Sequence, residues 1–374
     1  MIKKLQAGVP FYLKISVILL GLVAFFYVVF IAQNIILPLV FAVLVSILLN
    51  PLVNFLTNRK VNRILAIIIS IILALLVMAG IIIFIISQFD MFGEAMPTIK
   101  QKATSVFQQI TAWGARTFNL SYEKMNSYIT KETKEGISHS NAVIGSTVTT
   151  ISRVLIMLVL IPVYIFLLLV YKPLILKFIS KLFPVELHVT VLEVLAQSKL
   201  LIQQYLIGIL LELAMVSTLT AIGLFCIGIQ SPILFGVITG LLNMIPYVGV
   251  LIANAAAVLI ALVTKSPSAA LLVLGLYILV QFIDNNFIVP KVIGSKVQIN
   301  ALATIITVLV GGELCGIAGM FLAIPVTAVF KVICDKVPPL EPLGYLLGDE
   351  MPSAKKKIFN IRLPLKTEDK RKNK

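Results

Sequence analysis

The chain has 374 residues, of which 59% are hydrophobic and only 13% are charged. A soluble protein carries roughly twice that density of charge, so composition excludes a water-soluble globular fold. The net charge of +15 lies in short clusters between and after the apolar runs. Because no basic surface with interleaved aromatic residues accompanies it, nucleic acid is excluded as a partner.

Five uncharged runs are long enough to cross a membrane, which takes roughly 17–25 apolar residues. They cover residues 15–58, 64–89, 154–171, 213–264 and 266–283. Backbone polar groups must be satisfied internally in lipid, so runs of this kind form helices. The sequence therefore predicts an all-α integral membrane protein with eight hydrophobic helical segments.

Residues 1–89 are predicted to form an N-terminal frame of three spans. The run 15–58 contains 44 residues and must hold two of them, at about 15–34 and 36–57, with a tight turn at Gln33, Asn34 and Pro38. A short basic loop then leads to the third span, at about 64–88. No small-residue cleavage site follows the first span, so it is expected to stay in the mature protein.

The next three predicted segments alternate between polar and apolar composition. Residues 90–148 hold six basic and five acidic side chains and are predicted to be an extracytoplasmic amphipathic insertion, broken at Pro97 and Gly114. Residues 149–171 are the fourth span. Residues 172–203 are predicted to form two cytoplasmic amphipathic helices, before and after Pro184.

Residues 204–334 are predicted to be the transport core, because they contain two interrupted apolar segments. The uncharged stretch 232–264 has 33 residues, so as one helix it would reach about 50 Å, against a bilayer core of about 30 Å. The stretch 297–333 has the same excess length. Paired interrupted segments of this kind point to the binding site of a secondary transporter. The residues expected to break these helices are Pro246, Gly249, Pro290, Gly294, Gly311, Gly312, Gly316, Gly319 and Pro325.

Two topologies fit these lengths. If both interrupted segments cross the membrane, the chain has eight spans, with Lys265 inside and Lys291 and Lys296 outside. If both are re-entrant hairpins, it has six full spans and an inverted repeat in its C-terminal half, and these lysines change sides. The positive-inside rule favours the hairpins and puts both termini in the cytoplasm of a bacterial inner membrane. The basic cytoplasmic tail, residues 335–374, is expected to contact anionic headgroups.

Ionisable groups inside apolar segments are candidates for function, because burial there disfavours their charged forms. Glu212 is expected about 18 Å deep, where it can bind a proton or a cation. Asp284 and Asn285 end a predicted span and offer donors and acceptors to a polar solute or ion. Glu313 stands beside Gly311 and Gly312, which expose backbone groups. The alternatives are a neutral structural Glu212 and a capped helix end at Asp284.

The segment from Asn243 to Gly249 is the strongest local signal for a binding site. Pro246 removes a backbone donor, Gly249 permits a bend, and Tyr247 adds an aromatic face with a hydroxyl. Such a break at membrane depth survives where it lines protein or water. The alternative is an ordinary span with a proline kink.

No constellation of a soluble enzyme is present. His139 and His188 lie in polar segments, the three cysteines are scattered, and no Walker or HExxH motif occurs. We therefore expect no enzymatic activity, no cofactor and no metal site, and transport driven by a gradient.

At these motifs the chain resembles the autoinducer-2 exporter family of membrane proteins. The resemblance rests on the segments 243–249, 284–290 with Gly294, and 311–325, together with Gln204 to Gly208 and the order of the spans. It implies a multi-spanning inner-membrane protein that forms homo-oligomers. It also implies either export of the signalling furanone or exchange of sodium or lithium for protons. Glu212 replaces the apolar or small residue usual in the family, and Val250 replaces a proline.

Three functions follow from these observations. The first is export of a small polar organic solute, similar to the signalling furanone, by alternating access around the two interrupted segments. The second is a sodium or lithium/proton antiporter, which requires Glu212, Asp284 and Glu313 close together. The third is a membrane scaffold that uses the insertion and the tail as docking surfaces. A polar cavity near Asn243 and Asn285 would favour the first.

Overall fold

The computed structural model describes residues 10–118, 147–245, 248–292 and 299–349, and these contain helices and no strands. Six of the helices are long and apolar enough to cross a membrane, which confirms the predicted all-α membrane fold. The main helices are α2 (Phe11–Ile31), α3 (Gln33–Asn58), α4 (Arg63–Phe118), α6 (Thr147–Val170), α7 (Lys172–Lys181), α8 (His188–Ile227), α9 (Pro232–Asn243), α10 (Val248–Thr264), α11 (Pro267–Ile283), α12 (Val289–Val292), α13 (Ala301–Lys336) and α14 (Glu341–Leu347).

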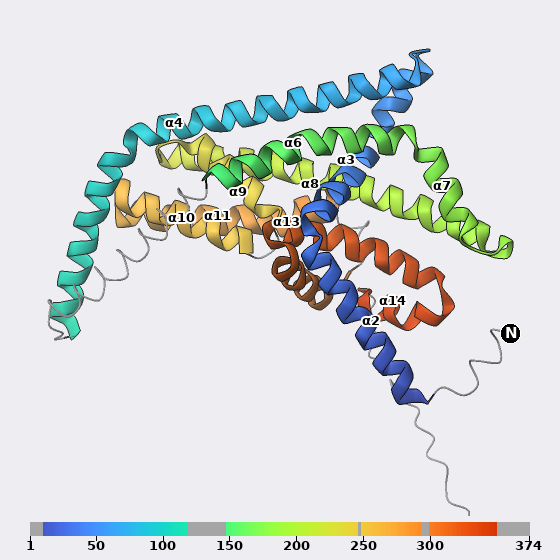
Figure 1. Cartoon of the computed structure of the whole chain (residues 1–374). Helices are drawn as coiled ribbons and strands as arrows, with labels where there is room; N and C mark the ends of the chain where they lie inside the picture. Colours follow the sequence, from blue (N-terminus) through green and yellow to red (C-terminus); the bar gives the residue numbers. More distant parts are fainter. Residues whose placement is uncertain (1–9, 119–146, 246–247, 293–298, 350–374) are drawn as a thin grey trace, which may run out of the picture.

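The first two helices are separated by a single residue, and the tight turn expected there is absent. The Ala32 N–H donates to the Val28 carbonyl, and the Ile36 N–H donates to the Ala32 carbonyl, both at 2.9 Å. Helical hydrogen bonding therefore passes through the junction. Figure 1 shows α2 leading away from α3 instead of folding back beside it. Pro38 lies inside α3, where a proline bends a helix without reversing it.

Two helices are longer than composition suggests. Helix α4 continues from its apolar half to Phe118, through the predicted breaks at Pro97 and Gly114, and bends along its length (Figure 1). Helix α8 has 40 residues and a length of about 60 Å, so it joins a predicted amphipathic helix to a predicted span. The change from polar to apolar side chains alters what surrounds a helix, but it does not end the helix. Residues 119–146 of the insertion and the tail beyond 349 lie outside the described residues.

The first interrupted segment consists of α9 and α10, packed against each other. Their break follows Asn243, as predicted, although Pro246 and Tyr247 lie outside the described residues. Gly249, at the start of α10, lies against the backbone carbonyl of Leu242 near the end of α9. A side chain at position 249 would collide with that carbonyl, so glycine permits the chain to fold back here.

The second interrupted segment, α13, also folds back on itself. Cys315 and Gly316 have non-helical backbone angles, and Gly316 adopts φ 61°, the left-handed region that favours glycine. The backbones of Gly311 and Gly319 are in direct contact across this turn. In a straight helix those residues would be about 12 Å apart, so the two arms of α13 run antiparallel. Pro325 is buried in the second arm.

The buried apolar side chains form separate clusters. One joins α3, α4 and α6 around Ile67 and Leu169. Another joins α8, α9, α10 and α11 around Leu224 and Val273. A third connects Leu44 of α3 with Leu206 of α8 and Leu322 of α13. The N-terminal helices and the interrupted segments thus have cores of their own, and α8 and α13 pack against α3 between them.

Candidate functional site

Three side chains from separate helical elements meet near the break after α9. The amide nitrogen of Asn243 donates to Glu212 Oε1 at 2.7 Å and to Asp284 Oδ2 at 3.1 Å. Glu212 and Asp284 are buried, at 7% and 3% exposure. The two hydrogens of one amide therefore hold two carboxylates that are 72 residues apart in the chain.

Close packing of α8 against α9 aligns Asn243 with Glu212. Gly236 lies near the Ser217 carbonyl, and Gly240 lies against the Ser217 hydroxyl and the Leu213 carbonyl. Two glycines four residues apart permit this approach, as at many helix contacts in membranes. Asn243 follows Gly240 by three residues, so it projects from nearly the same face of α9, one turn further on.

A local widening of the helix places Asp284 in the site. Residues Asp284–Ile288 form a π-helical segment between α11 and α12, and the Val289 N–H donates to the Asp284 carbonyl. Pro290 follows and has no N–H to continue the regular pattern. The helix continues to Val292, so Asp284 is an internal residue of the span and not its capped end. Single π-turns inside helices are frequent at functional sites.

The three side chains form part of the wall of a cavity of about 540 Å³. Asn285, Gln281 and Thr304 add amide and hydroxyl groups to the wall, and Tyr205 adds a phenol. Met244 and Val250, on either side of the break, also line it, as does Ile324 from the second arm of α13. Both interrupted segments thus contribute to one cavity.

One oxygen of Asp284 has no hydrogen-bond partner. Asp284 Oδ1 is buried and unpaired, whereas Oδ2 accepts from Asn243. Two buried carboxylates that share one amide repel each other when both are charged, and a proton or a bound cation would relieve that repulsion. The arrangement is suited to bind a proton or a small cation beside Asp284.

Several predicted site residues lie at this cavity and others do not. Glu212, Asn243, Asp284 and Asn285 line it, and Gly249 is next to the lining residue Val250. Glu313 is exposed on α13 and does not line it. Of the three carboxylates that an antiporter would need close together, Glu212 and Asp284 meet at Asn243 and Glu313 does not. Pro246, Tyr247 and Gly294 lie outside the described residues, while Gly311, Gly312, Gly316 and Gly319 shape the turn in α13.

Some residues of the site carried no recognisable signal of their own in the sequence. Tyr205 precedes Glu212 by seven residues, and Gln281 precedes Asp284 by three, so helical spacing from a known acid identifies both.

A second buried polar pair joins α9 to α11, because Thr239 Oγ1 and the Tyr277 hydroxyl are 2.8 Å apart. Thr239 is one turn from Asn243, and Tyr277 is two turns from Asp284.

Comparison with known proteins agrees with this architecture. The family model described as AI-2E family transporter matches residues 17–338. The protein YrrI of Bacillus subtilis is 36% identical over 129 residues, which cover 34% of this chain and 36% of YrrI. The AI-2 transport protein TqsA of Escherichia coli is 26% identical over 126 residues, which cover 34% of this chain and 37% of TqsA. The matched region thus spans about a third of either relative. Since the family model covers most of its length, the chain belongs to the AI-2E family of membrane transporters.

Proposed function

We propose that the cavity beside Asn243 is the transport site, and that the protein exports a small polar organic solute in exchange for protons or sodium. The observation that carries this proposal is the amide of Asn243, which holds Glu212 and Asp284 together in the cavity wall. In this proposal the two carboxylates bind the proton or sodium ion that drives transport, and the rest of the cavity wall binds the solute.

The coupling step is binding and release of a cation at the carboxylate pair. Asn243 holds both carboxylates in place, and Asp284 Oδ1, buried and without a hydrogen-bond partner, is the oxygen that can accept a cation or a proton. Oxygen ligands of this kind suit sodium and lithium, and a proton on either carboxylate removes the same repulsion. Cation binding then alters the charge of the cavity that also holds the solute, which couples the two binding steps.

The size and lining of the cavity support an organic solute. About 540 Å³ is far more than a dehydrated alkali ion fills, and it falls in the range typical of small-molecule sites, roughly 300–1,000 Å³. Gln281, Asn285 and Thr304 can hydrogen-bond hydroxyl and carbonyl groups, while Val250 and Ile324 cover an apolar edge. A hydroxylated furanone such as autoinducer-2 has this mixture of groups.

Cation/proton antiport is the second candidate, and the carboxylate pair favours it. It predicts cation flux that needs no organic solute. The position of Glu313, away from the cavity and exposed, removes one of the three acids on which that function relied.

The interrupted segments are proposed to be re-entrant hairpins that form an inverted repeat. Helix α9 has 12 residues and a length of about 18 Å, and the first arm of α13, up to the turn at Cys315, reaches about 21 Å. Neither crosses a core of about 30 Å. Helix α9 ends beside the cavity at Asn243, whereas α13 reaches it through Thr304 and Ile324 on its two arms, away from the turn at Cys315.

The orientation of the lysines supports the same topology. Lys199, in the first third of α8, is close enough to Lys172 of α7 to repel its charge. Lys265 Nζ donates to the Ile227 carbonyl at the other end of α8, about 42 Å further along that helix. With Lys172 in the cytoplasm, Lys265 is outside, and α11 and α12 return the chain to Lys291 inside. The C-terminus is then cytoplasmic, while the cytoplasmic N-terminus remains a prediction of the charge distribution, because the tight turn expected between the first two spans is absent.

The moving unit is proposed to be residues 204–333, which alternate between two positions against a static frame of residues 1–88. The separate apolar clusters around Ile67 and around Leu224 support this division, and the third cluster, which joins Leu44 to α8 and α13, is the contact across which the two parts would move. The frame is also proposed to hold the contacts of a homo-oligomer, as the family resemblance implies, with apolar side chains of α2 such as Val17 and Leu20, 69% and 74% exposed, facing lipid or a neighbouring subunit.

Flux in proteoliposomes tests the proposal. The purified protein is reconstituted, and uptake of labelled autoinducer-2, or of ²²Na⁺, is measured with an imposed proton or sodium gradient. We expect gradient-driven movement of the organic solute that is lost in Asn243→Ala. Sodium/proton exchange without the solute would establish the antiporter instead, and no flux of either would contradict a transport role for this cavity.

A further inference from the structure

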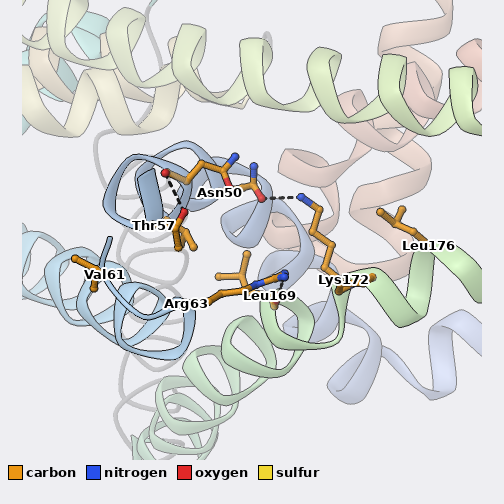
Figure 2. Close-up of a pocket in the computed structure, with 10 residues that line it drawn as sticks. Asn50, Thr57, Val61, Arg63, Leu169, Lys172 and Leu176 are labelled. Atoms are coloured by element: carbon orange, nitrogen blue, oxygen red, sulfur yellow. Dashed lines mark hydrogen bonds between the residues drawn. The ribbon is translucent and has the colours of Figure 1, made fainter. Parts of the chain in front are cut away.

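A second cavity lies at the junction of the N-terminal helices, away from the site described above. It has a volume of about 520 Å³ and lies between the end of α3, the start of α4 and the junction of α6 with α7. Figure 2 shows Asn50, Arg63 and Lys172 around it, with Leu169 next to Arg63 and Leu176 beyond Lys172. None of these residues was expected to bind a ligand.

The positively charged side chains at this cavity donate hydrogen bonds to neutral groups. Lys172 Nζ donates to Asn50 Oδ1 at 2.8 Å, and Arg63 Nη2 donates to the Leu169 carbonyl at 3.1 Å. Asn50 is itself 6% exposed. Lys199 of α8 and Arg63 are both close enough to Lys172 to repel its charge. Two positive groups, Arg63 and Lys172, thus line one cavity, and a third, Lys199, acts on Lys172 from α8.

Carboxylates do not compensate this charge in the part of the chain that the structure describes. The salt bridges found there join Lys331 to Asp335 and Lys336 to Glu193, on other helices. Uncompensated cations that converge on a cavity repel one another, so an anionic ligand would stabilise the arrangement. Arg and Lys with a neighbouring amide are the donors that commonly bind phosphate oxygens.

We propose that this cavity binds a phosphate group, with Arg63 and Lys172 as its direct partners and Asn50 positioning Lys172. The apolar side chains of Val53, Leu169 and Leu176 also line the cavity. They suit the glycerol and first methylenes of an anionic phospholipid. Exposed apolar side chains such as Ile64 and Leu174 stand next to the cavity residues Arg63 and Pro173, so acyl chains have a surface to follow. A soluble phosphate compound has the same anionic group and is the alternative source.

Native mass spectrometry of the full chain in detergent tests this proposal. Dioleoylphosphatidylglycerol is titrated against dioleoylphosphatidylcholine, and inorganic phosphate is added as a competitor. The pocket variant is Arg63→Gln with Lys172→Gln. The matched control is Lys177→Gln with Lys181→Gln, which removes two exposed charges of the same helix outside the cavity.

We expect wild type and control to bind phosphatidylglycerol in preference to phosphatidylcholine. The pocket variant should lose affinity about fivefold for each removed charge. Arg63→Lys with Lys172→Arg should retain most of the binding, which separates charge from a folding defect. Displacement by inorganic phosphate, without preference for the lipid, would assign the cavity to a soluble phosphate compound. Equal binding by pocket variant and control, or no binding of either probe to wild type, would overturn the proposal.

Discussion

Asn243 and Glu212 are hydrogen-bonded at 2.7 Å although they belong to different helices and are 31 residues apart. The contact exists because two glycines of α9 bring that helix directly onto α8. The same amide donates to Asp284, so Asn243 is the only described side chain seen to bond both carboxylates. Its replacement is the most direct test of the site.

Asn243→Ala should reduce flux about tenfold or more. Hydrogen bonds to charged groups contribute about 1.5–3 kcal/mol, and each 1.4 kcal/mol is a factor of ten. Initial rates in proteoliposomes measure the effect. Asn254→Ala is the matched control, since Asn254 is on α10 and does not line the cavity. Equal rates for both variants would remove Asn243 from the transport site.

Asp284→Asn should lower flux and flatten its dependence on pH, because the substitution keeps the shape but removes a group that can exchange a proton. Glu212→Gln should act in the same direction. Rates between about pH 5.5 and 8.5 are compared with those of Glu313→Gln, whose side chain is exposed and away from the cavity. A strong loss in Glu313→Gln with normal flux in Asp284→Asn would reverse this assignment.

Gly249→Ala should lower both thermal stability and flux. A Cβ at this position meets the backbone carbonyl of Leu242, which cannot move without separating α9 from α10. Overpacking of this kind costs about 1–3 kcal/mol. Gly275→Ala is the control, because a Cβ there meets nothing within 4 Å. Unfolding followed by fluorescence in detergent compares the two, and equal melting temperatures would contradict the tight fold-back.

Cysteine labelling should place Lys265 outside and Lys177 inside. Single cysteines at these positions, in a protein whose three native cysteines are replaced by serine, are exposed to an impermeant maleimide in intact cells. We expect labelling at 265 from outside, and at 177 and 291 only after permeabilisation. Outward labelling at position 291 would favour two full crossings over re-entrant hairpins. Lys296, predicted on the same side, is outside the described residues.

The sequence alone determined the membrane class and the breaks within the two interrupted segments, although the breaks predicted at Pro97 and Gly114 are absent. An apolar run has few alternatives in lipid, because every backbone group must be bonded within the segment. The break after Asn243 and the turn at Gly316 were also predictable, since proline and glycine act on the backbone through their own covalent geometry. These are local effects, and they need no knowledge of what packs nearby.

The tertiary structure decided which polar groups meet. Glu212, Asp284 and Glu313 looked equivalent in sequence, yet the first two share Asn243 and the third is exposed. The continuation of α4 beyond residue 88 and the continuity of α8 through residue 204 were missed as well, because a change of composition does not break a helix. Likewise, Arg63 and Lys172 lie in basic clusters of the sequence, and those clusters predicted only which side of the membrane the loops face. Their shared cavity depends on how α3, α4 and α6 pack, and that packing joins residues more than 100 positions apart. Side-chain partners of this kind are set by helix contacts across the bundle, which no local pattern encodes.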